Sequence, residues 1–119
     1  MIRGVGVDVV DVARFEATLI RTPAIRSRLF APGEQELPIQ SLAARFAAKE
    51  ALAKALGGPA GLSWHETEVV GGGDTGSAPR FVLTGAVAEL VGAGRTHLSL
   101  SHDAGMAIAY VVLEDVDAG

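Results

Sequence analysis

A chain of 119 residues is long enough for one hydrophobic core and too short for two, so we expect a single domain over residues 1–119. The net charge of −4 argues against general nucleic-acid binding, and the absence of cysteine excludes disulfides and zinc–thiolate sites, which fits a reducing cytoplasm. The longest apolar run, Met106 to Leu113, is far shorter than the roughly 18 residues of a membrane span. We therefore expect a cytoplasmic protein that engages neither a membrane nor nucleic acid.

The first part of the chain is expected to contain one strand and three helical pieces. A β-branched, alternating pattern predicts the strand. Asp11 is a residue type that caps helix N-termini, and Thr22-Pro23 breaks the helix that it begins. The expected elements are a strand over Ile2–Val10, a helix from Asp11 to about Arg21, a helix over Ala24–Leu29 and a short helix between Ala31-Pro32-Gly33 and Pro38.

A long helix is expected from Leu42 to Leu56, because this run has no glycine, proline or β-branched residue. Ser41 is the expected N-cap, and Gly57-Gly58-Pro59 is the expected stop. At about 100° per residue, the alanines share one face, which lets another backbone approach closely. These alanines are Ala44, Ala47, Ala48, Ala51 and Ala55. The opposite half is expected to meet water or a ligand, and it carries Arg45, Lys49, Glu50 and Lys54.

The remaining elements are short and favour an antiparallel sheet. They are strands over Thr67–Val70 and Arg80–Leu83 joined by a flexible turn over Gly71–Ala78, a helix over Ala86–Val91, a strand over His97–Ser101, a tight turn at Asp103-Ala104-Gly105 and a strand over Met106–Leu113. The last strand is apolar enough to be buried on both faces. The order of elements predicts an α+β fold in which a small antiparallel sheet packs with one long central helix and shorter helices.

Positive charge is concentrated at the N-terminal end. Five of the ten basic residues lie between Met1 and Arg28, a segment that holds three of the fourteen acidic residues. The five are Arg3, Arg14, Arg21, Arg26 and Arg28. The segment is therefore a basic region on an acidic protein.

Three polar places are candidates for chemistry, and each also has an ordinary explanation. Asp8 lies in an apolar strand, where a buried carboxylate is costly unless a cation or several hydrogen-bond donors contact it. The ordinary explanation is that Asp8 lies at the end of the strand and faces solvent. Glu50 lies one helical turn from Lys54. The ordinary explanation of this spacing is a solvated Glu–Lys pair on the helix surface. His102 lies in the run Ser99–Asp103, and a histidine at a strand end is often only a hydrogen-bonded surface residue.

Taken together, these places predict a metal and phosphate site. Asp8 and Glu50 come from separate elements and suit Mg²⁺, which uses one or two carboxylates and fills its shell with water and phosphate oxygens. Arg45, Lys54 and His102 would supply donors to such phosphates. The sequence thus favours a phosphorylated ligand bridged by a metal ion.

Other catalytic patterns are not matched. Gly71-Gly72-Gly73 lacks the Gly-Lys-Ser/Thr of a P-loop, and Gly4-Val5-Gly6 lacks the third glycine of a dinucleotide fingerprint. Ser101-His102-Asp103 does not make a catalytic triad, because neighbours in a strand point to opposite faces.

The sequence resembles the holo-acyl-carrier-protein synthases, the small bacterial branch of the 4′-phosphopantetheinyl transferases. Three motifs carry the resemblance, in the order and spacing of that family. They are Gly4-Val5-Gly6-Val7-Asp8, Arg45-Phe46-Ala47-Ala48-Lys49-Glu50-Ala51 with Lys54, and Leu98-Ser99-Leu100-Ser101-His102-Asp103.

The resemblance implies transfer of 4′-phosphopantetheine from coenzyme A, the co-substrate, to a serine hydroxyl of apo-acyl carrier protein, leaving adenosine 3′,5′-bisphosphate. It implies that Asp8 and Glu50 bind a Mg²⁺ ion that bridges the pyrophosphate. The implied coenzyme A contacts are Lys54 at the pyrophosphate, Arg45 and His102 near the 3′-phosphate, and Gly57 and Ser101. A base must also accept the serine proton; Glu50 is the first candidate, and His102 or Asp103 is the second.

The resemblance further implies a homotrimer with active sites between subunits, which the apolar last strand and the alanine face would help to form. It places the acidic carrier protein on the first helix, at Arg14 assisted by Arg21 and Arg28. The alternative is that these arginines form only a solvated helix face.

Two other functions compete with transfer. A coenzyme A or nucleotide-binding module would keep the pocket without turnover, although binding alone does not require two carboxylate ligands. A metal-dependent phosphohydrolase would use water as the acceptor.

Overall fold

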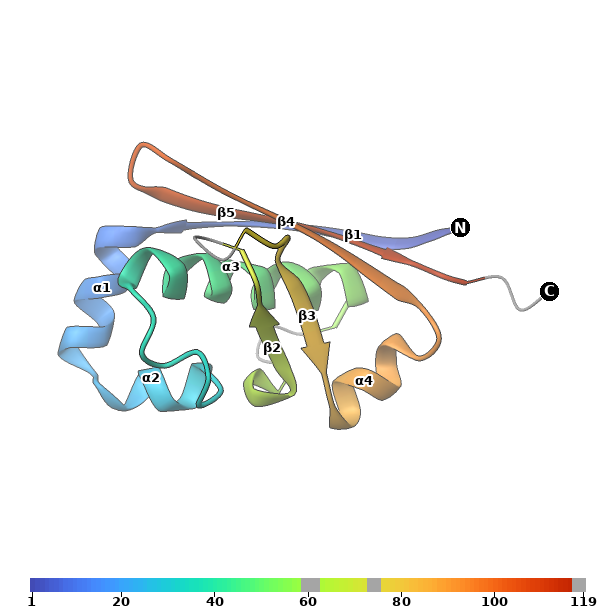
Figure 1. Cartoon of the computed structure of the whole chain (residues 1–119), viewed down its shortest axis with the longest axis horizontal. Coiled ribbons are helices and arrows are strands. Elements are labelled where there is room, and N and C mark those ends of the chain that lie inside the picture. Colours follow the sequence, from blue (N-terminus) through green and yellow to red (C-terminus); the bar gives the residue numbers. More distant parts are fainter. Residues whose placement is uncertain (59–62, 73–75, 117–119) are drawn as a thin grey trace.

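The computed structural model describes residues 1–58, 63–72 and 76–116, and its elements form layers around one long helix (Figure 1). The elements are β1 (Ile2–Asp11), α1 (Val12–Arg21), α2 (Ala24–Leu29), α3 (Ile39–Leu56), the 3-10 helix η1 (Trp64–Glu66), β2 (Thr67–Val70), β3 (Arg80–Leu83), α4 (Gly85–Val91), β4 (Arg95–Asp103) and β5 (Met106–Glu114). Pro59 of the expected helix stop and residues 73–75 of the expected turn lie outside the described residues. Within the described ranges, no helix has the length and apolar character needed to cross a bilayer.

The main sheet has three antiparallel strands, with β5 between β1 and β4. Its register places Val7 opposite Tyr110, and Tyr110 opposite Ser99. β2 and β3 form a separate antiparallel pair. Figure 1 shows α3 running along one face of the main sheet, with α1 and α2 at one end. The expected α+β fold with an antiparallel sheet and a long central helix is confirmed.

The contact between β1 and α3 depends on the small side chains predicted to allow a close approach. A Cβ atom at Gly6 would overlap the carbonyl oxygen of Ala51 and lie 2.9 Å from its carbonyl carbon, and one at Gly4 would overlap the carbonyl oxygen of Ala55. Side chains alternate along a strand, so Asp8 lies on the same face of β1 as Gly4 and Gly6 and points towards α3. The alanine face of α3 is therefore covered by this chain's own sheet and is not free to meet another subunit, contrary to expectation.

The β4–β5 hairpin closes through the predicted tight turn. Ala104 and Gly105 both have positive φ, 50° and 77°, as a two-residue turn that follows the sheet twist requires. Asp103 still pairs with Met106, so β4 is longer than predicted. The backbone N–H of Val12 donates to the Gly105 carbonyl at 3.0 Å, which ties the hairpin tip to the start of α1.

The predicted cap of the long helix is wrong. α3 begins at Ile39, Pro38 occupies the N-cap position, and Ser41 lies inside the first turn. Proline fixes its own φ, here −58°, and lacks the N–H that would be unpaired at a helix start, so it begins the helix before serine is reached.

The helix predicted between Ala31 and Pro38 is also wrong. The segment forms turns, in which the N–H of Glu34 donates to the Ala31 carbonyl at 2.8 Å and the N–H of Leu37 donates to the Glu34 carbonyl at 3.2 Å. The Glu34 carboxylate is fully buried and accepts the Ala31 N–H at 2.9 Å. This side-chain bond holds the segment in a turn that sequence propensity does not indicate.

Within one chain, the main sheet buries only one of its faces. Along β5, Ala107, Ala109, Val111 and Leu113 have no exposed surface, whereas Tyr110 is 48% exposed. Val5, Val7 and Val9 of β1 are also about half exposed. The strand predicted to be buried on both faces thus keeps an apolar outer face that this chain does not cover.

Candidate active site

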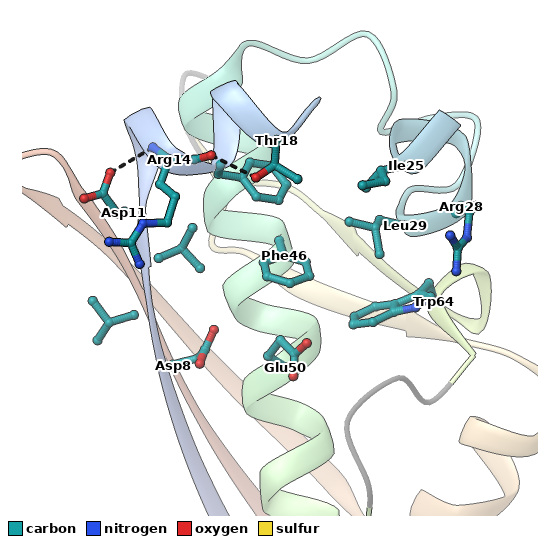
Figure 2. A pocket seen from close by; sticks show the side chains of 13 residues that line it. Asp8, Asp11, Arg14, Thr18, Ile25, Arg28, Leu29, Phe46, Glu50 and Trp64 are labelled. Atoms are coloured by element: carbon teal, nitrogen blue, oxygen red, sulfur yellow. Dashed lines mark hydrogen bonds between the residues drawn. The ribbon is translucent and has the colours of Figure 1, made fainter. Parts of the chain in front are cut away.

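Asp8 of β1 and Glu50 of α3 face each other across the contact between strand and helix. Figure 2 shows both carboxylates at one side of a pocket. The Asp8 side chain is 18% exposed. Lys54, one turn after Glu50, donates from Nζ to Asp8 Oδ1 at 3.1 Å and to the Val7 carbonyl at 2.9 Å. The spacing of one turn between Glu50 and Lys54 thus places the ammonium of Lys54 beside Asp8.

The two carboxylates repel each other, which makes a cation favourable between them. Burial raises the pKa of Glu50, the charge on Asp8 raises it further, and Lys54 partly opposes the shift. Among the described residues, no group of three or more His, Cys, Asp or Glu side chains could hold a metal ion. A metal at Asp8 and Glu50 would have two protein ligands, which suits Mg²⁺ with phosphate and water completing its shell.

The pocket has a volume of about 640 Å³, and most of its lining away from the carboxylates is apolar. An aromatic series forms part of this lining. Phe46 stacks on Phe15, with ring centroids 5.1 Å apart, and on Trp64, with centroids 5.6 Å apart. Sequence reasoning did not single out these aromatic residues. The position of Phe46, one helical turn before Glu50 on α3, was the pattern that could have indicated an aromatic side chain beside the carboxylate.

Two of the three predicted docking arginines border the same pocket. Arg14 comes from α1 and Arg28 from α2, and they stand on opposite sides of the opening (Figure 2). Arg21 lies at the exposed C-terminal end of α1 and does not line this pocket. Asp11 accepts the Arg14 N–H at 3.0 Å, which confirms Asp11 as the N-cap of α1.

His102 and Asp103 lie in another place. They line a second pocket of about 450 Å³ between α1, the start of α3 and the β4–β5 turn, and this pocket shares no lining residue with the first. His102 donates from Nε2 to the Gln40 carbonyl at 3.2 Å. Ser101 is exposed on β4. A single chain therefore does not bring these residues into the pocket that holds Glu50.

Arg45 and Lys49 do not face open solvent, contrary to expectation. Arg45 is 9% exposed and donates to the carbonyls of Val69 at 3.3 Å and Gly71 at 3.1 Å; burial lowers its pKa. Lys49 is 3% exposed and donates from Nζ to Glu34 Oε1 at 2.8 Å. Burial lowers the pKa of Lys49, and the hydrogen bond and charge of Glu34 oppose that shift.

Glu34 is the residue that sequence reasoning missed. Arg45 and Lys49 are four residues apart and share a helix face, and two like charges so placed repel each other, which a nearby anion relieves. That spacing was a weak signal for an acid near this face, and it did not identify which one. Gly57 has φ 70° and forms the C-cap of α3, which confirms it as part of the helix stop.

Comparisons with known proteins identify the family of this chain. Residues 4–110 match the family described as the 4′-phosphopantetheinyl transferase superfamily. A holo-[acyl-carrier-protein] synthase of Clavibacter sepedonicus is 61% identical over 96% of this chain and 97% of its own.

Solved structures give the same result. The holo-(acyl-carrier-protein) synthase of Bacillus anthracis in complex with CoA (3′,5′-ADP) is 30% identical, with a TM-score of 0.78 over 98% of this chain and 99% of its own. That of Helicobacter pylori in complex with coenzyme A is 31% identical, with a TM-score of 0.78 over 92% and 99%. The chain described here belongs to the 4′-phosphopantetheinyl transferase superfamily.

Proposed function

We propose that this protein transfers 4′-phosphopantetheine from coenzyme A to a serine hydroxyl of an apo-acyl carrier protein. The observation that carries the proposal is the pair of carboxylates, Asp8 and Glu50, with Lys54 beside them at one side of an apolar pocket. The names of the relatives and their coenzyme A complexes supply the substrates. The absence of cysteine suits action in the cytoplasm.

Asp8 and Glu50 would hold Mg²⁺, because two facing carboxylates and a raised pKa at Glu50 are the surroundings that a divalent cation relieves. When bound, the ion neutralises charge on the pyrophosphate of coenzyme A. Lys54 binds the same pyrophosphate; its side chain is 55% exposed, and its ammonium reaches the Asp8 carboxylate.

Glu50 is the proposed base that accepts the proton of the attacking serine. It lies in the pocket, where a substrate hydroxyl can approach its carboxylate. His102 and Asp103 remain the second candidates, and they reach the reaction only if another copy of the chain brings its second pocket to this one.

That requirement supports a homotrimer whose active sites lie between subunits. His102 and Ser101 of another copy would complete the coenzyme A site. Gly57 at the end of α3 and Arg45, which donates to the Val69 and Gly71 carbonyls of its own chain, are the other proposed contacts. The exposed outer face of the main sheet, with Val7 and Tyr110 about half exposed, supports a partner there. Light scattering at micromolar concentration should give three times the chain mass, and an active monomer would refute the trimer.

The carrier protein would dock on α1 at Arg14 and Arg28, which border the pocket, with Arg21 assisting. Acyl carrier proteins are acidic, and this is the basic region of a chain with net charge −4.

Incubation with coenzyme A and Mg²⁺, with and without apo-carrier protein, tests the proposal by mass spectrometry. Transfer predicts a carrier heavier by one phosphopantetheine and release of adenosine 3′,5′-bisphosphate only when carrier is present. Release without carrier would instead indicate a phosphohydrolase, and no turnover in either mixture would indicate a binding module.

A further inference from the structure

We propose that the buried ion pair of Glu34 and Lys49 positions Glu50 and Trp64, two residues that line the active-site pocket. Glu34 and Lys49 act as positioning residues, since neither of them lines the pocket. The inference rests on the proposed metal site at Asp8 and Glu50.

The pair links segments that are distant in the sequence. Lys49 Nζ donates to Glu34 Oε1 at 2.8 Å, to the Trp64 carbonyl at 3.0 Å and to the Thr67 carbonyl at 2.7 Å. An ammonium has three N–H donors, so all three are used. Lys49 is thereby fixed to the turn that holds Glu34, to η1 and to β2.

Glu34 completes the link from the other side. Its Oε1 also accepts the Ala31 N–H at 2.9 Å, and its Oε2 accepts the Val69 N–H at 3.0 Å. Arg45 Nε lies 4.0 Å from Oε2. The carboxylate has no exposed surface, so its negative charge depends on these partners.

The consequence for the active site follows from chain neighbours. Lys49 precedes Glu50, so clamping Lys49 fixes the rotation of α3 about its axis at the turn where Glu50 faces Asp8. One of the carbonyls that Lys49 holds belongs to Trp64, whose ring stacks on Phe46 and lines the pocket. The buried pair is thus connected to two residues of the pocket, Glu50 and Trp64.

The test is a titration of the metal-free protein with Mn²⁺ alone. Electron paramagnetic resonance measures the free Mn²⁺, and the binding affinity follows from it. The variants are Lys49→Met, which keeps the side-chain volume without the donors, and Glu34→Gln, which keeps the shape without the charge. Val87→Ala in α4, equally buried but in neither pocket, is the matched control for lost stability. All proteins are measured in sucrose, which favours the folded state, and folding is checked by circular dichroism.

We expect each folded variant to bind Mn²⁺ about tenfold more weakly than wild type, as is typical when groups that orient metal ligands are removed. We also expect the emission of Trp64, the single tryptophan, to shift to the red as its backbone anchor is lost. Val87→Ala should change neither property, whatever its melting temperature.

Unchanged Mn²⁺ affinity and Trp64 emission in folded Lys49→Met and Glu34→Gln would overturn the inference and leave the pair a purely structural ion pair. If only one of the two variants folds, that variant decides. Wild-type protein and Asp8→Asn distinguish this failure from failure of the proposed function. If wild type itself bound no Mn²⁺, or Asp8→Asn bound it equally well, the metal site would be wrong and the positioning role would fall with it.

Discussion

At the scale of single residues, the ionised carboxylate of Glu50 destabilises the folded state. Its pKa is raised, first by burial and then by Asp8, so the folded chain binds its proton more tightly than the unfolded chain does. The ionised carboxylate therefore lowers stability. This cost is absent below the ordinary glutamate pKa of about 4.3 and is fully present above the raised pKa. Such a cost is expected where a side chain is kept for function.

Glu50→Gln should consequently raise the melting temperature of the metal-free protein at pH 7, and the gain should disappear near pH 4. Thermal unfolding across that pH range measures it. Glu36→Gln, at an exposed glutamate, is the control and should show little gain. A Glu50→Gln protein less stable than wild type at pH 7 would mean that the carboxylate is stabilised by its neighbours.

The residue scale also shows where sequence reasoning stops. Helical phase was enough to place Lys54 on the face of α3 that carries Glu50, and from that face Lys54 contacts Asp8. It could not show that Lys49 is buried against Glu34, since the partner lies in a turn fifteen residues earlier. Local patterns carry no information on such a long-range pair.

At the scale of elements, the close contact of β1 with α3 sets the distance between the two carboxylates. The glycines of the first motif are required by packing: a Cβ atom at Gly6 would overlap the backbone of α3. The same motif was read from the sequence as a marker of function. Its physical role is to bring Asp8 within reach of the helix.

Gly6→Ala should therefore destabilise the protein by about 1–3 kcal/mol or more through overpacking, and it should weaken transfer by moving Asp8. Urea unfolding and the transfer assay measure the two effects. Gly57→Ala is the comparison for stability, because Gly57 has a positive φ but nothing within 4 Å of its Cβ position. It should cost about 1–2 kcal/mol from backbone strain alone. A neutral Gly6→Ala would mean that β1 and α3 are not as tightly packed as described.

Most elements could be predicted because their signals are local. The Asp11 cap, the alanine-rich run of α3 and the turn at Ala104 and Gly105 each depend on neighbouring residues. One failure came where tertiary contacts decide. Glu34 is drawn into the core and holds the segment that was predicted to be helical in a turn. The start of α3 was missed for a local reason, because Pro38 begins the helix ahead of Ser41.

At the scale of the whole molecule, the placement of charge suits the proposed acidic partner. Arg14 of α1 and Arg28 of α2 border the pocket on a chain of net charge −4. Electrostatic docking acts mainly on association and weakens with salt, since the Debye length falls from about 10 Å at 0.1 M to about 3 Å at 1 M.

Arg14→Glu should raise the Michaelis constant for the carrier severalfold and leave coenzyme A affinity almost unchanged. The effect should shrink as salt is added. Arg80→Glu, the same charge reversal at an exposed residue of β3, is the control. Weakened coenzyme A binding with normal dependence on carrier would place the docking surface elsewhere.

The central claim is that Asp8 and Glu50 together carry the transfer reaction. It is tested most directly by the rate of transfer from coenzyme A to apo-carrier protein at saturating Mg²⁺, for wild type, Asp8→Asn and Glu50→Gln. Both variants should remain folded by circular dichroism and should be slower by at least about 10²-fold, the range found when one group that stabilises transition-state charge is removed. Near-normal rates in both folded variants would contradict the account.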